Sequence, residues 1–341
     1  MENLTKSSGE NFTVINSSLL SCLSSQRSVT VGQAVGAMAY CIMIFLSLVG
    51  NILVVVIVYR CPTMKTTAYY LMANVAVADV IFFMSAGPRQ IIEVFTEPSR
   101  WLLTGDAGLL FCQISSFCMD SCQIVSVYSS VAIGINRWLA VLHPKHRKIY
   151  AFRTRHLIAG VWVMCMLIFV HYFRSFDLTR RNGSYYCHLS LAPSSLTAYV
   201  VTITLLQYVL PLILITVCYI KVISKLNENR FLGSPSSTTA TRRKHRNRRV
   251  TKMALTITVT FVVLWTPFVI YSYLVVFVWN RTNICPLTDV RFAVMFVAHS
   301  YCMINPWIYF STGGMFRRGL QELWARFNAN CTYFATTAAS E

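Results

Sequence analysis

Seven long apolar segments constrain the fold of this 341-residue chain more than any other feature. A hydrocarbon core about 30 Å thick requires roughly 20 apolar residues in a helix that rises about 1.5 Å per residue. Lipid offers no partners for unpaired backbone groups, so the pattern predicts an all-α membrane protein that crosses the bilayer seven times. The expected spans are Ala34–Tyr59, Ala68–Pro88, Ala107–Ile135, Leu157–Phe173, Ser195–Ile220, Met253–Trp279 and Phe292–Phe316.

The charges and glycosylation sequons predict the orientation. If the N-terminus lies outside, 21 of the 30 Lys and Arg residues fall on the cytoplasmic side, as the positive-inside rule requires. The net charge of +18 then reflects topology, and no nucleic-acid partner is expected. We therefore expect a multi-pass protein of the cell membrane with an extracellular N-terminus and a cytoplasmic C-terminus. Sequons that this topology places outside, where glycans are added, begin at Asn3, Asn11, Asn16, Asn182 and Asn280.

Two soluble segments complete this organisation. Residues 1–33 are polar and rich in Ser, Thr and Asn, which is typical of a disordered, glycosylated extracellular tail. Between the fifth and sixth spans, Gly233–Thr241 and the basic run Arg242–Arg249 are expected to form a flexible loop. The basic run is expected to lie against anionic lipid or an acidic partner surface.

Four of the 12 cysteines face the oxidising outer side: Cys22, Cys112, Cys187 and Cys285. Four cysteines permit three pairings. Cys112 at the outer end of the third span and Cys187 in the loop before the fifth are the expected pair. Cys22 and Cys285 then either form a second disulfide or remain unpaired thiols.

Asp79 and Asp120 are the only acidic residues in the seven segments, and such residues are candidate functional groups because they are costly in lipid. Asn51, Ser126 and Asn305 could meet Asp79 at one depth. Carboxylate, hydroxyl and amide oxygens suit a Na⁺ ion, with Asp79, Ser126 and Asn305 as its ligands. The alternative is a protonated, hydrogen-bonded acid without an ion. No other cofactor is expected.

Prolines interrupt four spans, at Pro88, Pro211, Pro267 and Pro306. Each proline removes a helix hydrogen bond, and the kinks that result serve either as hinges or as static bends. Enzyme chemistry is not indicated, since the chain has no GxSxG, His-Glu-x-x-His or Gly-rich phosphate-binding motif.

A series of short motifs, each in the right span and in the right order, resembles the rhodopsin-like (class A) G-protein-coupled receptors. These motifs are Gly50-Asn51, Leu71–Asp79 (LMANVAVAD), Cys112, Asn136-Arg137-Trp138, Trp162, Pro211, Tyr219, Phe261–Pro267 (FVVLWTP), Asn305–Tyr309 (NPWIY), Phe316 and Arg317. The resemblance implies a seven-transmembrane receptor domain over residues 34–316. It also implies a short amphipathic eighth helix and cytoplasmic tail over residues 317–341.

The resemblance implies a switch driven by ligand binding. An extracellular ligand is expected to favour an outward movement of span six about Pro267, with Trp265 at the pocket floor and Val127 in the packing relay below it. The expected partners are a heterotrimeric G protein, arrestin, receptor kinases and the lipid bilayer. The residues expected in the switch and in G-protein coupling are Asn136, Arg137, Trp138, Pro211, Tyr219, Phe261, Pro267, Asn305, Pro306 and Tyr309.

The chain departs from the family pattern at four places, one of which is the start of span six, where Arg246, Asn247 and Arg248 offer no acid. Asn136 stands where the family has an acid beside Arg137. Lys145 replaces a hydrophobic residue of the second inner loop, and Tyr301 replaces a small polar residue near the expected Na⁺ site. The loss of the acid predicts a weaker restraint on Arg137 in the inactive state.

A peptide is the expected ligand. Met119 occupies the position of the amine-binding aspartate, which argues against a biogenic amine, and Asn305–Phe316 looks like the same region of vasopressin-type and oxytocin-type receptors. The alternatives are a small lipid, nucleotide or carboxylate ligand, and a seven-span transporter or channel. The expected pocket residues are Arg89, Gln90, Met119, Asp120, Gln123, Trp265, Phe268, Ser272, Arg291, Met295 and His299.

Overall fold

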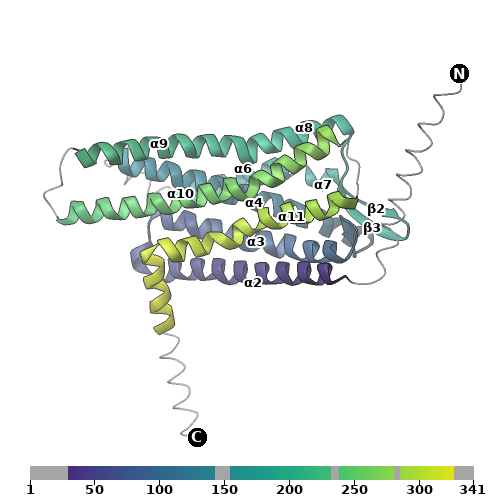
Figure 1. Cartoon of the computed structure of the whole chain (residues 1–341), viewed down its shortest axis with the longest axis horizontal. Coiled ribbons are helices and arrows are strands. Elements are labelled where there is room, and N and C mark those ends of the chain that lie inside the picture. The colour runs from purple at the N-terminus through teal and green to yellow at the C-terminus, as the bar shows by residue number, and fades with distance from the viewer. Residues whose placement is uncertain (1–29, 143–153, 232–237, 280–284, 326–341) are drawn as a thin grey trace, which may run out of the picture.

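The computed structural model describes residues 30–142, 154–231, 238–279 and 285–325, and within these ranges the chain forms a bundle of seven membrane-length helical segments. Figure 1 shows the segments lying side by side along the long axis of the molecule. The first four are α2 (Val31–Arg60), α3 (Thr67–Phe95), α4 (Gly105–Leu142) and α6 (Thr154–Phe169). The fifth comprises α8 (Pro193–Thr204), η4 (Leu205–Val209) and α9 (Leu210–Phe231), the sixth α10 (Thr238–Tyr273) and η5 (Leu274–Val278), and the seventh is α11 (Cys285–Thr312).

Among the described residues, six helical segments are both long enough and apolar enough to cross a membrane. The seventh span, α11, has the required length but also contains Asp289, Arg291, His299 and Asn305, which lower its mean hydropathy. His299 and Asn305 are buried in the bundle, so their polarity is not presented to lipid. The predicted seven-helix membrane fold is therefore confirmed.

Most helices begin or end at residues other than those expected, and three of these differences change the interpretation of the chain. The helix α3 passes through Pro88 and continues to Phe95, because membrane helices tolerate proline where neighbours satisfy the freed carbonyl. The basic run Arg242–Arg249 is helical, so its prediction as a flexible loop was wrong. Ala, Arg and Lys favour helix, so the run can continue the helix of the sixth span. The seventh span ends at Thr312, not Phe316, and residues 314–325 form a separate helix.

Polar side chains join the helices inside the bundle. Asn51 of α2 donates from Nδ2 to the Cys302 carbonyl of α11 at 3.1 Å. Asn74 of α3 donates to Ser129 Oγ at 2.8 Å and accepts from Trp162 Nε1 at 2.9 Å, which joins three helices. Buried amide groups stabilise a membrane bundle when their hydrogen bonds are made between helices, and these residues meet that condition.

Two glycines permit close contacts around the first span. A Cβ atom at Gly50 would lie 2.7 Å from Pro306 Cγ, so only glycine allows α2 and α11 to approach this closely. A Cβ atom at Gly319 would lie 2.5 Å from Ile57 Cγ2, which places the helix of residues 314–325 against the inner end of α2. Phe316 anchors this helix, since its buried ring stacks on Tyr309 with centroids 5.4 Å apart.

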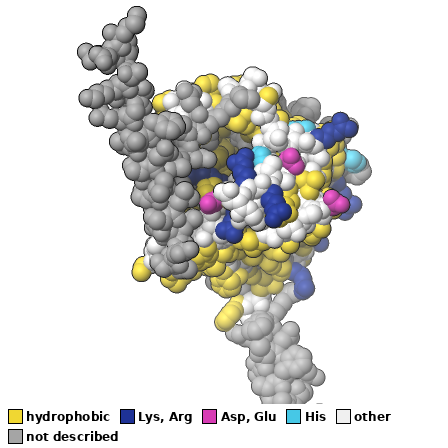
Figure 2. Space-filling model, turned by 90° about the vertical axis from the view of Figure 1, so that its right-hand side faces the viewer, with side chains coloured by type: hydrophobic (Ala, Val, Ile, Leu, Met, Phe, Trp, Pro, Cys, Tyr) yellow, Lys and Arg dark blue, Asp and Glu magenta, His cyan; other side chains and the backbone are white. Residues whose placement is uncertain are grey.

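A small antiparallel sheet covers part of the outer end. Its strands lie in the order β1 (Arg100–Trp101), β3 (Ser184–Leu189) and β2 (Phe176–Arg181), and the short helix α7 (Tyr172–Ser175) precedes β2. The β2–β3 turn contains Asn182 and Gly183, both with positive φ, and Asn182 is exposed at its predicted sequon. Charged side chains of both signs gather on this end of the molecule (Figure 2), whereas hydrophobic side chains cover much of the flank below it.

The Cys112–Cys187 disulfide joins β3 to the outer end of α4, as predicted. The other candidate pair cannot be placed, because Cys22 and the side chain of Cys285 lie outside the described residues. The sequons at Asn3, Asn11, Asn16 and Asn280 and the inner-loop residue Lys145 also lie outside them.

Candidate functional site

A cavity of about 210 Å³ opens within the outer half of the bundle, between α3, α4, the fifth span, α10 and α11. Aromatic and aliphatic side chains form most of its wall, together with a few polar groups. Eight of the expected pocket residues line it: Met119, Asp120, Gln123, Trp265, Phe268, Ser272, Met295 and His299. A mostly apolar cavity with a few convergent polar groups is the usual form of a ligand site.

Asp120 is the carboxylate of the cavity wall. Its Oδ2 atom accepts a hydrogen bond from the Tyr172 hydroxyl at 2.5 Å, and that hydroxyl also contacts the hydroxyl of Tyr199. The ring of Tyr172 packs against Phe169 and Phe176, with centroids 5.2 Å and 4.6 Å apart. Tyr172 is thus held firmly beside the carboxylate.

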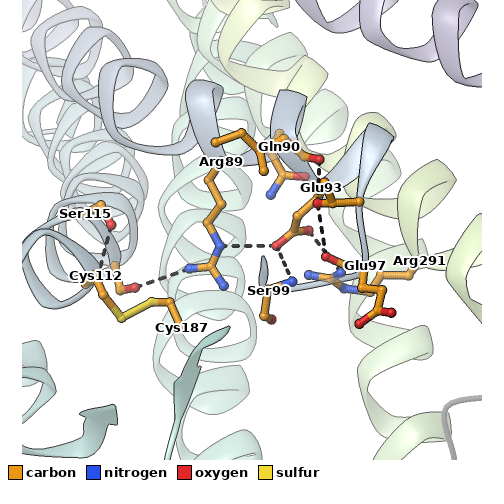
Figure 3. A network of polar contacts seen from close by, with 12 residues as sticks. Arg89, Gln90, Glu93, Glu97, Ser99, Cys112, Ser115, Cys187 and Arg291 are labelled. Atoms are coloured by element: carbon orange, nitrogen blue, oxygen red, sulfur yellow. Dashed lines mark hydrogen bonds and ion pairs between the residues drawn. A yellow bond between two sulfur atoms is a disulfide. The ribbon is translucent and has the colours of Figure 1, made fainter. Parts of the chain in front are cut away.

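The other three expected pocket residues, Arg89, Gln90 and Arg291, do not line this cavity. Arg89 and Arg291 instead form ion pairs with Glu93 of α3, at 3.2 Å and 3.0 Å (Figure 3). The Ser99 backbone N–H also donates to Glu93 Oε1 at 3.1 Å. Glu93 therefore joins α3, α11 and the segment before β1 at the outer end of the bundle.

Gln90 is buried next to this network. Tyr40 of α2 donates its hydroxyl to Gln90 Oε1 at 3.5 Å, and the same hydroxyl lies 3.3 Å from His299 Nδ1. These contacts connect Gln90 to the cavity wall through Tyr40 and His299. Outside the membrane-spanning segments, a hydrogen bond from the Tyr186 hydroxyl to Glu97 Oε2 raises the pKa of Tyr186.

A stack of aromatic rings extends from the cavity floor into the core. Trp265 contacts Phe268 above it and Phe261 below it, with centroids 5.7 Å and 6.2 Å apart. Phe261 in turn contacts Tyr208 of the fifth span at 5.8 Å and Tyr301 of α11 at 5.3 Å. A shift of Trp265 must therefore disturb the packing between spans five, six and seven. Val127 is buried in the same core, and Pro211 lies in α9 one turn past Gln207.

Deeper in the bundle, Asp79 is almost fully buried and accepts a hydrogen bond from Asn305 Nδ2 at 3.2 Å. Within the described part of the chain, the Ser126 hydroxyl and Asn305 Oδ1 are buried without a hydrogen-bond partner. Asn51 points its amide nitrogen at the Cys302 carbonyl, where it restrains α11. One carboxylate with two unused oxygens fits a small hard cation, and Asp79, Ser126 and Asn305 would hold it. Within the described ranges, no group of three or more His, Cys, Asp or Glu side chains could hold a metal ion.

The family described as "7 transmembrane receptor (rhodopsin family)" matches residues 50–309, which is most of the chain. This protein belongs to the rhodopsin family of G-protein-coupled receptors. The receptor is 28% identical to the RYamide receptor of Drosophila melanogaster over 301 residues, which cover 85% of this chain and 63% of that receptor.

Two further relatives are similar to the same extent. The Substance-P receptor of Aquarana catesbeiana is 29% identical, with 86% of this chain and 72% of the relative covered. The Substance-K receptor of Bos taurus is 27% identical, with 83% and 73% covered. The matched family consists of seven-transmembrane receptors and not of enzymes, so the prediction that this chain is not an enzyme is confirmed.

At the cytoplasmic end of the receptor, Arg137 donates from Nη2 to Asn136 Oδ1 at 2.8 Å. The neighbouring Trp138 ring lies 5.6 Å from Lys221 Nζ of α9, within the range of a cation–π contact. Tyr219 and Tyr309 are both buried. Pro267 and Pro306, both expected in the switch, lie inside α10 and α11, and both helices continue past them.

Sequence reasoning missed three residues of the outer half of the receptor. Glu93 was missed because the second span was ended at Pro88, although its i,i+4 spacing from Arg89 is typical of a helical ion pair. Tyr172 contacts Asp120, and Gln207 lines the cavity. Both positions depend on the tertiary structure, for which the sequence carries no signal. Gln207 lies in η4, a π-helical turn that Pro211 favours because it cannot donate to the carbonyl four residues before it.

Proposed function

We propose that this receptor binds an extracellular peptide in the cavity between spans three, five, six and seven, and activates a heterotrimeric G protein. The single observation that carries the proposal is the location of the cavity. It lies in the outer half of the bundle, directly above Trp265 and the aromatic stack that joins three spans. Binding there can alter the packing on which the position of α10 depends.

The mechanism follows from this packing. A ligand shifts the equilibrium between two arrangements only by its difference in affinity for them. A ligand that displaces Trp265 favours the arrangement in which Phe261 no longer packs against Tyr208 and Tyr301. Pro267 supplies the flexible point above this contact, since α10 lacks one hydrogen bond there. The inner part of α10 then moves outward and opens the cleft beside Arg137.

Two observations favour a peptide over a small anionic ligand. The RYamide, Substance-P and Substance-K receptors are neuropeptide receptors, and their identities of 27–29% support the ligand class without identifying the ligand. The arginines that would bind a free carboxylate, Arg89 and Arg291, already share the carboxylate of Glu93. A small lipid, nucleotide or carboxylate ligand would have to displace this ion pair.

The experiment is a peptide screen in cells that carry G-protein dissociation sensors. RYamide, Substance P and Substance K form the first set, followed by pools of amidated and free-acid peptides. We expect at least one peptide to produce dissociation that the Trp265→Ala variant loses at matched surface expression. A matched control, Trp324→Ala, changes an exposed tryptophan outside the bundle and should respond normally. If only lipids, nucleotides or small carboxylates activate the receptor, the peptide proposal is wrong.

A further inference from the structure

Asp120 makes the cavity strongly asymmetric in charge. Among the described residues that line the cavity, it is the one carboxylate, and no Lys or Arg lies among them. The remaining wall is mostly aromatic and aliphatic, with Tyr199, Trp265 and Phe268 among the rings. A carboxylate in such surroundings attracts a cation more strongly than it would in water, because the local dielectric is low.

The hydrogen bonds of Asp120 are also incomplete. An ionised carboxylate has room for about four hydrogen bonds, whereas Asp120 accepts one, from Tyr172, among the described residues. A buried charge is stable only when it is paired or well hydrogen-bonded. Tyr172 holds the carboxylate in place and leaves it accessible to the cavity. The Arg89 charge also acts on Asp120, but Arg89 lies outside the cavity wall and is ion-paired with Glu93. Within the cavity, the structure therefore supplies one half of an ion pair.

Two unpartnered donors line the same cavity. The Nε1 atom of Trp265 and the Nε2 atom of Gln207 are buried and have no hydrogen-bond partner among the residues that the structure describes. The side chain of Trp265 is also more than nine-tenths buried. An orphan donor lowers stability unless something bound next to it accepts its hydrogen. The cavity thus offers one carboxylate and two N–H groups.

We propose that this cavity is a subsite for a basic residue of the ligand, whose guanidinium or ammonium group pairs with Asp120 while neighbouring carbonyl groups accept from Gln207 and Trp265. The aromatic wall suits the apolar stem of such a side chain, and the Tyr199 ring can lie against its cationic head. Tyr172 is a positioning residue, because it acts through Asp120. The inference rests on the proposed function, which supplies the peptide.

The test uses two small probes on the purified receptor in lipid nanodiscs. N-acetyl-arginine amide carries the cation and two carbonyls, and N-acetyl-citrulline amide has nearly the same shape without the charge. Ligands of this size bind with Kd values near the millimolar range, so binding is measured by saturation-transfer NMR at about 10 mM. We expect the arginine probe to bind the wild-type receptor about tenfold more tightly than the citrulline probe.

The variants separate the charge of Asp120 from its structural role. Asp120→Asn keeps the shape and should abolish the preference for the arginine probe, while weak binding of both probes remains. Tyr172→Phe should reduce the preference only partly. The matched control is Asp106→Asn, an exposed aspartate of the same helix, which should leave the preference unchanged. The proposal is overturned if Asp120→Asn retains the preference, if both probes bind the wild-type receptor equally, or if the arginine probe does not bind.

Failure of the peptide proposal can be distinguished from failure of the subsite proposal. A receptor that binds the arginine probe through Asp120 but responds to no peptide has a cationic ligand of another class, and only the peptide proposal falls. A receptor that responds to peptides but shows no Asp120-dependent preference has its peptide site without this subsite. If active peptides keep their potency when citrulline replaces each Arg, this result would support a peptide site without this subsite.

Discussion

Loss of the Glu93 carboxylate is expected to destabilise the outer end of the receptor more than loss of either arginine that contacts it. The Glu93 side chain is 8% exposed, against 12% for Arg89 and 26% for Arg291. Glu93→Gln leaves the guanidinium groups of Arg89 and Arg291 without the carboxylate that pairs with both of them. Arg291→Gln, in contrast, leaves the carboxylate paired with Arg89 and hydrogen-bonded to the Ser99 N–H.

The magnitude follows from this burial. Breaking a fully buried ion pair by removing one partner costs about 3–5 kcal/mol, whereas an exposed pair contributes about 0–1 kcal/mol. Because the arginines are partly exposed, we expect about 2–4 kcal/mol for Glu93→Gln. For Arg291→Gln we expect about 1 kcal/mol. The loss of stability in Glu93→Gln should change little with salt concentration, because salt screens charges only weakly when they are buried away from solvent.

The assay is thermal unfolding of the solubilised receptor, followed with a fluorescent thiol reagent. Cys122, Cys165 and Cys302 are buried free thiols that react only when the bundle opens. The matched control is Glu97→Gln, which removes an acid of the same outer rim that accepts one hydrogen bond from Tyr186. The reasoning would be refuted if Glu93→Gln unfolded at the same temperature as Glu97→Gln. It would also be refuted if Glu93→Gln unfolded at a higher temperature than Arg291→Gln.

Three further predictions concern other parts of the receptor. Cys112→Ala should abolish surface expression or ligand response, because loss of a native disulfide typically costs about 2–5 kcal/mol; a free Cys112 thiol in non-reducing peptide maps would contradict this. Asn136→Asp should lower ligand-independent G-protein activation, since a carboxylate forms a stronger hydrogen bond with Arg137 than the present amide does. Unchanged basal activity at matched expression would mean that other contacts restrain the arginine. Asp79→Asn should erase any weakening of agonist affinity by external Na⁺. If wild-type agonist competition curves do not differ between Na⁺ and a bulky organic cation, Asp79 does not form a Na⁺ site.

Some features of the cavity could be predicted from sequence because the motifs indicate the depth of each residue in its span. Met119, Asp120, Trp265 and His299 were expected at the cavity and do line it. Residues at the helix ends were predicted less well. Arg89 was assigned to the pocket because it lies near the outer membrane surface, yet its guanidinium turns toward Glu93. Depth can be read from sequence, but the direction of a long side chain depends on its neighbours.

The sequence by itself determined the number of spans, because the length and apolar character of a helix in lipid are set by the thickness of the bilayer. It also predicted the Cys112–Cys187 bond that the structure contains. Only the tertiary structure decided which polar groups meet inside the bundle. The pairing of Glu93 with Arg291 and the contact of Tyr172 with Asp120 join residues far apart in the chain. Such contacts depend on how the helices are rotated and packed, and helix rotation is not specified by hydropathy alone.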